Sequence, residues 1–148
     1  MTKTCLDIMT KDPFCCVPTD SAQRVAQLMR DRDVGAVPVC ESHEAKRLIG
    51  IVTDRDLALR IVAAGCDPKS TCARNVMTRE VFSCRPEDDL QKALELMERR
   101  QVRRIPIVDR QNRIVGIIAQ ADIATRLKNP QTISEVIEVI STPRMMAA

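Results

Sequence analysis

The sequence contains two copies of one pattern, and this duplication constrains the fold more than any other feature. A shift of 68 positions aligns the first half of each copy, and a shift of 66 aligns the second half after a loop that is two residues longer in the first copy. Matches in one order across both copies indicate an internal repeat. The aligned pairs are Met9 with Met77, Thr10 with Thr78, Pro18 with Pro86, Pro38 with Pro106, Gly50 with Gly116 and Asp56 with Asp122.

Each copy predicts a β-α-β-β-α unit. An extended piece at 14–17 or 81–84 precedes a helix, and a hairpin then pairs a proline-containing strand, 36–40 or 104–108, with a glycine-containing one. A second helix at about 54–64 or 120–128 closes the copy, ended by Gly65 or by Asn129-Pro130. The apolar residues of the first helix follow the i, i+3, i+4, i+7 spacing of one helix face: Ala22, Val25, Ala26 and Met29, and then Leu90, Ala93, Leu94 and Met97.

These bounds divide the chain into four parts. The repeats span 4–65 and 72–129, with a linker at 66–71 and a C-terminal helix and tail at 130–148. One copy buries too little surface to be stable alone, so we expect two repeats packed with pseudo-twofold symmetry, as an α/β fold of small mixed sheets flanked by helices. An apolar stripe at 132–140 would pack on this module or on a second subunit, which favours a homodimer.

Each glycine-containing strand runs directly into a helix, and polar side chains lie at that point. In the first copy the junction carries Thr53 and Asp56, and in the second it carries Ala119 and Asp122. Unpaired N–H groups at a helix start favour anions there, so two related ligand sites are expected. Because proline cannot donate to a ladder, Pro38 and Pro106 would leave a backbone carbonyl or a neighbouring N–H free for a ligand.

Composition argues against several functions. Phe14 and Phe82 are the only aromatic residues, and the net charge is +3, so a nucleic-acid partner is not expected. There is no secretory signal and no run of about 18 apolar residues, which predicts a cytoplasmic protein without a membrane span. No nucleophile–base pair is visible, so neither an enzyme nor a required cofactor is expected. With His43 as the single histidine and no Cys-x-x-Cys among seven cysteines, no metal site is predicted, and most cysteines are read as small buried residues.

The motifs resemble a tandem pair of CBS domains, a Bateman module. The resemblance rests on the two Met-Thr lead-ins, on Val37-Pro38-Val39 and Ile105-Pro106-Ile107, and on the two junctions that begin at Gly50 and Gly116. The resemblance covers about residues 4–128. Within this family, the chain is similar to small stand-alone bacterial CBS-pair proteins of the hypoxic-response type. The resemblance implies a regulatory module that binds AMP, ADP or ATP, or else NAD or S-adenosylmethionine, in clefts between the paired repeats, with an unknown protein target.

The resemblance also implies roles for particular residues. Asp56 and Asp122 match carboxylates that accept the ribose hydroxyls, and Thr53 matches a hydroxyl near the phosphate. Independently of the resemblance, Arg55, Arg103 and Arg104 could neutralise phosphate charge. The expected walls of the adenine sites are Ala36, Val37, Pro38, Arg104, Ile105 and Pro106, with the pieces that follow Thr10 and Thr78.

Two signals have structural alternatives. Thr53 and Asp56 have the spacing of a capping box, which needs no ligand. Ala119 cannot cap, yet Asp122 is present, so the acid does not depend on a reciprocal threonine, although phosphate binding at the second site is in doubt. The basic run at Arg99-Arg100 and Arg103-Arg104 can be a solvated helix end or an anion patch.

Cys16 and Cys40 support a second hypothesis. Each of the two cysteines lies at the end of a strand, and these two strands would be neighbours. A Cys16–Cys40 disulfide can therefore be tested, because the Cα atoms of a disulfide lie within about 7 Å of each other. With Ala119 and the cysteine count, it would fit a structural or interaction protein in a stress or redox response, without a ligand.

Overall fold

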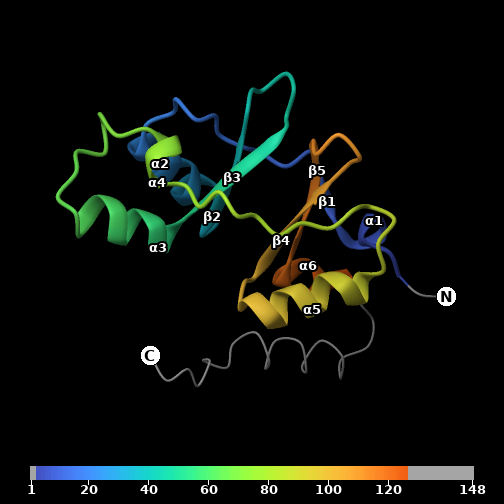
Figure 1. Cartoon of the computed structure of the whole chain (residues 1–148). Coiled ribbons are helices and arrows are strands. Elements are labelled where there is room, and N and C mark those ends of the chain that lie inside the picture. Colours follow the sequence, from blue (N-terminus) through green and yellow to red (C-terminus); the bar gives the residue numbers. More distant parts are fainter. Residues whose placement is uncertain (1–2, 127–148) are drawn as a thin grey trace. The chain divides into compact units, whose positions relative to one another are not determined.

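The computed structural model describes residues 3–126 and divides into two compact units (Figure 1). We call Phe14–Val81 with Gln111–Ile114 the first-repeat unit. We call the described residues of the other unit, 3–13, 82–110 and 115–126, the second-repeat unit. Each unit has its own hydrophobic core.

The first-repeat unit is built on one hairpin and its helices. Strands β2 (Ala36–Cys40) and β3 (Leu48–Thr53) pair antiparallel, and they are followed by α3 (Asp54–Leu57), the π-helical turn η1 (Ala58–Val62) and α4 (Ala73–Val76). Helix α2 (Ala22–Arg32) begins at Ser21, whose hydroxyl accepts from the Arg24 N–H at 3.1 Å. It ends at Asp33 in the left-handed region.

The second-repeat unit repeats this arrangement. Its sheet has the order β1-β5-β4, from β1 (Thr10–Lys11), β5 (Ile114–Ala119) and β4 (Arg104–Val108). Around it lie α1 (Cys5–Ile8), α5 (Leu90–Arg100) and α6 (Gln120–Arg126). Helix α5 begins at Asp89, whose carboxylate accepts from the Gln91 N–H at 3.0 Å.

The two units exchange their lead-in segments. The segment before the first repeat packs in the second-repeat unit, where the Cys5 N–H donates to the Asp88 carbonyl at 2.9 Å and Thr10 pairs with Ile117. The segment before the second repeat packs in the first-repeat unit, where Ala73 donates to the Asp20 carbonyl and Thr78 exchanges two backbone bonds with Ile51. Each compact unit is therefore assembled from both repeats of the sequence.

Each exchanged lead-in segment packs closely against a glycine of the glycine-containing strand. A Cβ built on Gly50 would lie 2.6 Å from the Met77 sulfur and 3.0 Å from the Thr78 carbonyl oxygen. A Cβ on Gly116 would collide in the same way with the Met9 side chain. The Met-Thr lead-in and the strand glycine of the sequence pattern are thus the two sides of one close contact.

Most predicted elements are present, with three differences. The first helices bury the predicted faces, except that Ala26 is exposed and was wrongly assigned to the core. The pieces at 14–17 and 81–84 form single parallel bridges, Cys16 with Val39 and Cys84 with Ile107, instead of strands. The helix predicted over 54–64 is a short α-helix that continues as a π-helical turn.

The expectation of a free carbonyl at the strand prolines is wrong. The Pro38 carbonyl accepts from the Cys16 N–H at 2.9 Å, and the Pro106 carbonyl accepts from Cys84 at 3.1 Å. The bridging segments occupy the edge that proline leaves without a donor.

Two further expectations concern the end of the last predicted helix and the apolar stripe that follows it. The predicted end of the last helix at 129–130 and the apolar stripe at 132–140 lie outside the described residues. Between residues 3 and 126, no helix has the length and apolar character needed to cross a membrane.

Candidate functional site at two strand-to-helix junctions

At the first junction, β3 ends at Thr53 and α3 begins at Asp54. The Thr53 hydroxyl accepts from the Asp56 N–H at 3.1 Å, and the Asp56 carboxylate accepts from the Thr53 N–H at 2.9 Å. Both halves of the capping box are therefore formed, and they satisfy two N–H groups that have no helical partner. The capping box predicted from the spacing of Thr53 and Asp56 is confirmed.

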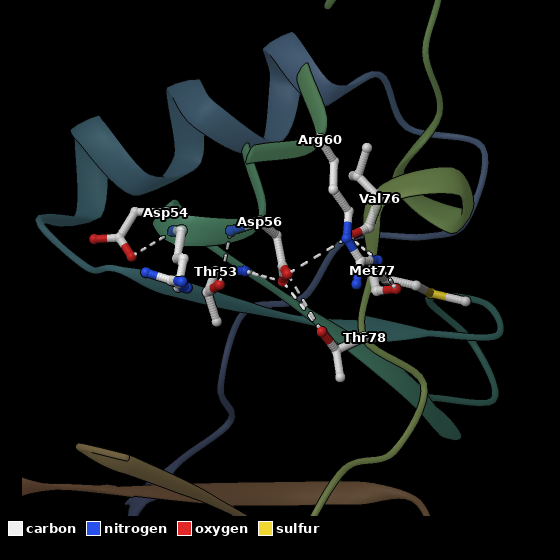
Figure 2. A network of polar contacts seen from close by, with 8 residues as sticks. Thr53, Asp54, Asp56, Arg60, Val76, Met77 and Thr78 are labelled. Carbon is white, nitrogen blue, oxygen red and sulfur yellow. Dashed lines mark hydrogen bonds and ion pairs between the residues drawn. The ribbon is translucent and has the colours of Figure 1, made fainter. Parts of the chain in front are cut away.

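The Asp56 carboxylate also has outer contacts (Figure 2). The Thr78 hydroxyl donates to its two oxygens at 3.3 and 3.4 Å, and the Arg60 Nε lies 3.9 Å from Oδ1. Hydroxyl–carboxylate bonds are ordinarily about 2.5–2.7 Å. The Thr78 contacts are therefore long, and a ligand hydroxyl could replace them.

Arg60 joins this junction to the lead-in segment. Its Nη1 donates to the carbonyls of Val76 and Met77, each at 3.1 Å, while its Nε faces Asp56 (Figure 2). The Asp56 side chain is 12% exposed and that of Arg60 is 49% exposed. Arg60 was not among the predicted site residues, although its i+4 spacing from Asp56 on one helix face is a signal that could have found it.

The second junction keeps the acid and loses the cap hydroxyl. The Asp122 carboxylate accepts from the Ala119 N–H at 2.8 Å and from the Thr10 hydroxyl at 3.1 Å. Thr10 occupies the place that Thr78 has at the first junction. The exchanged lead-ins thus bring one predicted threonine to each predicted aspartate.

The strand residues predicted as adenine walls divide into two groups. Ala36 pairs in register with Thr53 and is half-buried beside the first junction. Arg104 is also half-buried, and it is the first residue of β4 as Ala36 is of β2. The other four, Val37, Pro38, Ile105 and Pro106, are buried, and the structure places Val37 and Ile105 inside the hydrophobic cores.

The charged residues near the junctions are mostly exposed. Arg55 is exposed, and its N–H donates to the Asp54 carboxylate at 2.8 Å. In the basic run, Arg100 stacks 3.7 Å from the centre of the Phe82 ring, and the exposed Arg103 accepts the Gln120 N–H through its carbonyl. Within residues 3–126, no group of three or more His, Cys, Asp or Glu is placed to hold a metal ion.

Cys16 and Cys40 are neighbours through the backbone. The Cys40 N–H donates to the Cys16 carbonyl at 2.8 Å, yet both are free thiols, as are the other five cysteines. Burial raises the pKa of Cys16 to about 12. The side chain that faces the Cys40 thiol is that of Cys15.

Comparison with known proteins agrees with this architecture. The chain is 34% identical to hypoxic response protein 1 of Mycobacterium tuberculosis over 98% of this chain and 99% of the relative. The crystal structure of Hypoxic Response Protein I with two coordinated zinc ions matches with a TM-score of 0.76 and 36% identity, over 84% of this chain and 99% of that one. The structure of CBSX2 in complex with AMP shares the fold, with a TM-score of 0.69 and 24% identity, over 82% and 93% of the two chains.

The family comparison covers both repeats. The CBS domain family model matches residues 5–63 and again 73–129. These ranges contain both junctions, both lead-in glycine contacts and both hairpins described above. The chain therefore belongs to the CBS domain family, and it carries two CBS domains in tandem.

Proposed function

We propose that this chain is a regulatory module that binds an adenine nucleotide of the AMP, ADP or ATP class at its strand-to-helix junctions, and that it is not an enzyme. The observation that carries the proposal is the Asp56 carboxylate, which the backbone holds through Thr53 while its outer contacts to Thr78 remain long. A carboxylate can accept two hydrogen bonds from the vicinal hydroxyls of a ribose. Asp122, with Thr10, offers the same chemistry in the second-repeat unit.

The residues around each acid support a phosphate-bearing ligand. Arg55 is exposed next to Asp56, and Arg104 lies on the strand that flanks the second junction. Thr53 contributes a hydroxyl that Ala119 lacks, so the first junction is the better phosphate site. The fold is shared with CBSX2, which was crystallised with AMP, and we carry that ligand class over as a proposal. NAD and S-adenosylmethionine remain in the set of ligands to be tested.

Calorimetric titration tests the proposal. AMP, ADP, ATP, NAD and S-adenosylmethionine would be titrated into the wild type, Asp56→Asn and Asp122→Asn, because asparagine retains an oxygen for the capping N–H and loses the charge. We expect at least one nucleotide to bind. Its affinity should fall tenfold or more when the aspartate of the junction that binds it is replaced, Asp56 for the first junction and Asp122 for the second. Asp31→Asn is the matched control, since Asp31 is an exposed aspartate paired only locally with Arg30 in the described structure. Heat unchanged in both junction variants would reject the site, and no heat with any ligand would reject the function.

A second candidate function is an interaction protein that binds no ligand. It is favoured by the complete capping box, which gives Asp56 a structural role of its own, and by the loss of a hydroxyl at Ala119. Absence of heat in every titration, together with a stable fold, would favour this candidate. Chromatographic recovery of each nucleotide unchanged after incubation would separate both candidates from an enzyme.

We also propose that the chain acts as a cytoplasmic homodimer in a stress response. Leu59 and Val62 lie three residues apart in η1 and are 51% and 78% exposed, which supports an apolar contact with a second copy. Seven free thiols fit a reducing compartment, and the hypoxic response relative supports the stress role. A monomer by light scattering at tens of micromolar protein would contradict the dimer.

A further inference from the structure

The three cysteines around the end of β2 face different surroundings. Cys15 and Cys16 are consecutive on an extended segment, so their side chains point to opposite faces. Cys16 is fully buried in the first-repeat core with Val37 and Val39. Cys15 is half-buried and lies outside that core. The two neighbouring thiols therefore differ in access to solvent.

Cys40, like Cys15, lies outside the core that holds Cys16. Cys16 pairs in parallel with Val39, and the Cys40 N–H bonds to the Cys16 carbonyl, which fixes the extended segment along the end of β2. Val39 shares the core with Cys16, whereas Cys40, one position later, is buried outside it. The Cys15 and Cys40 thiols interact across this pairing, and each shifts the pKa of the other.

The turn after β2 supplies positive charge next to Cys15. The turn is closed by the Glu41 N–H, which donates to the Arg47 carbonyl at 2.7 Å, and it carries His43 and Lys46. Interaction with the Cys40 thiol, and then with His43 and Lys46, lowers the pKa of Cys15 to about 6. The same pairing and burial raise the pKa of Cys40. Cys15 is therefore the member of this pair that loses its proton first, and Cys40 is the member that keeps it.

The second-repeat unit contains a thiol pair that lacks this access. The Cys5 and Cys84 thiols also interact and shift each other's pKa, but they are 0% and 1% exposed. The interaction with Cys84 and burial raise the pKa of Cys5, and Asp88 and Asp89 raise it further. Reactivity requires a thiolate that solvent can reach. Cys5–Cys84 is thus an internal control for Cys15–Cys40.

We propose that Cys15 is a modification site that exchanges with small-molecule disulfides, and that Cys40 resolves the product into a Cys15–Cys40 disulfide. The Cys15 thiolate attacks one sulfur of the small disulfide, a bond forms between them, and one small thiolate leaves and takes up a proton from water. Cys40 then gives up its proton and attacks the Cys15 sulfur, which expels the second small thiolate. Two protein thiols are oxidised by two electrons in total, and one small disulfide is reduced to two thiols.

This reaction would link the extended segment covalently to the end of β2. Cys16 takes no part, because it lies in the core and the pKa of its thiol is raised to about 12. The pairing differs from the Cys16–Cys40 disulfide suggested by strand ends alone. It also does not depend on nucleotide binding, so either proposal can fail without the other.

Mass spectrometry of the full chain after incubation with oxidised glutathione tests the pairing. We expect the wild type and Cys16→Ser to lose two hydrogen atoms, in a cross-link between the tryptic peptides that hold residues 12–24 and 33–46. We expect Cys40→Ser to stop at one glutathione adduct on Cys15, and Cys15→Ser to form neither product. A cross-link that survives in Cys15→Ser and disappears in Cys16→Ser would overturn the proposal, as would a wild type that does not react.

Alkylation rates test the reactive thiol without any disulfide. With iodoacetamide, the rate at Cys15 should rise through a midpoint near pH 6, and at pH 7 it should exceed the rate at the exposed Cys66 several-fold. His43→Gln should move the Cys15 midpoint upward. Equal rates at Cys15 and Cys66 would overturn the assignment. Cys84 should remain unmodified in the folded protein, and circular dichroism would establish that each variant is folded.

Discussion

The two junctions hold an aspartate by the same backbone bond and differ in what surrounds it. Asp56 accepts from the Thr53 N–H and the Thr78 hydroxyl, lies 3.9 Å from the Arg60 Nε, and sits in a complete capping box. Asp122 accepts from the Ala119 N–H and the Thr10 hydroxyl, and no cap hydroxyl exists. The bond from the carboxylate to the N–H three residues earlier therefore survives the loss of the threonine. The position of the acid depends on the backbone and on the lead-in threonine, and the cap hydroxyl is an addition specific to the first junction.

The largest expected effect comes from the glycines under the lead-in methionines. Gly50→Ala and Gly116→Ala each force a Cβ into the methionine side chain and close to a backbone carbonyl. Overpacking of this kind costs about 1–3 kcal/mol, and we expect both units to lose stability in urea denaturation. Gly35→Ala is the control, because its nearest neighbour is the exposed Asp54 side chain, which can move. A loss in only one of the two glycine variants would show that the exchanged lead-ins are not equivalent.

The next effect tests the cap that distinguishes the junctions. Thr53→Ala converts the first junction to the pattern of the second, and the loss of an N-cap hydroxyl costs about 1 kcal/mol. Thr53→Ser retains the oxygen that accepts from the Asp56 N–H, so its loss of stability should be much smaller than that of Thr53→Ala. Thermal unfolding of both variants measures the difference. If serine destabilises as much as alanine, the methyl group and not the cap carries the contribution of Thr53.

A smaller effect is expected from the two lead-in threonines. Thr10→Val removes a 3.1 Å bond to Asp122, whereas Thr78→Val removes bonds of 3.3 and 3.4 Å to an acid that Arg60 still faces. We expect about 1 kcal/mol for Thr10→Val and less for Thr78→Val, because a carboxylate that keeps a cation nearby loses less. Urea midpoints of the two valine variants decide the order. The reverse order would mean that the long Thr78 contacts are stronger than their geometry indicates.

The smallest effect concerns Arg60. Its ion pair with Asp56 spans 3.9 Å and half of the arginine side chain is exposed, so the pair contributes a few tenths of a kcal/mol at most. Most of the loss in Arg60→Met should come from the bonds to the Val76 and Met77 carbonyls, and it should persist in 1 M salt. A loss that disappears in high salt would assign the role of Arg60 to the ion pair.

Local sequence determined much of this protein. Residue spacing alone predicted the duplicated unit, the buried faces of α2 and α5 apart from Ala26, the hairpins, and the capping box at Thr53 and Asp56. These features depend on residues within about one helical turn or one hairpin, so pattern and propensity suffice for them.

Tertiary structure alone decided which segments meet. The Met-Thr lead-ins are nearly the same in both copies, so no local signal could tell that Met77 would cover Gly50 and Met9 would cover Gly116. The bridging segments that take the carbonyls of Pro38 and Pro106 also come from outside the hairpins, as does Cys15 opposite Cys40. Side chains distant in sequence meet because burying the cores and satisfying strand edges require it, and the energy of those contacts exists only when both partners are in place.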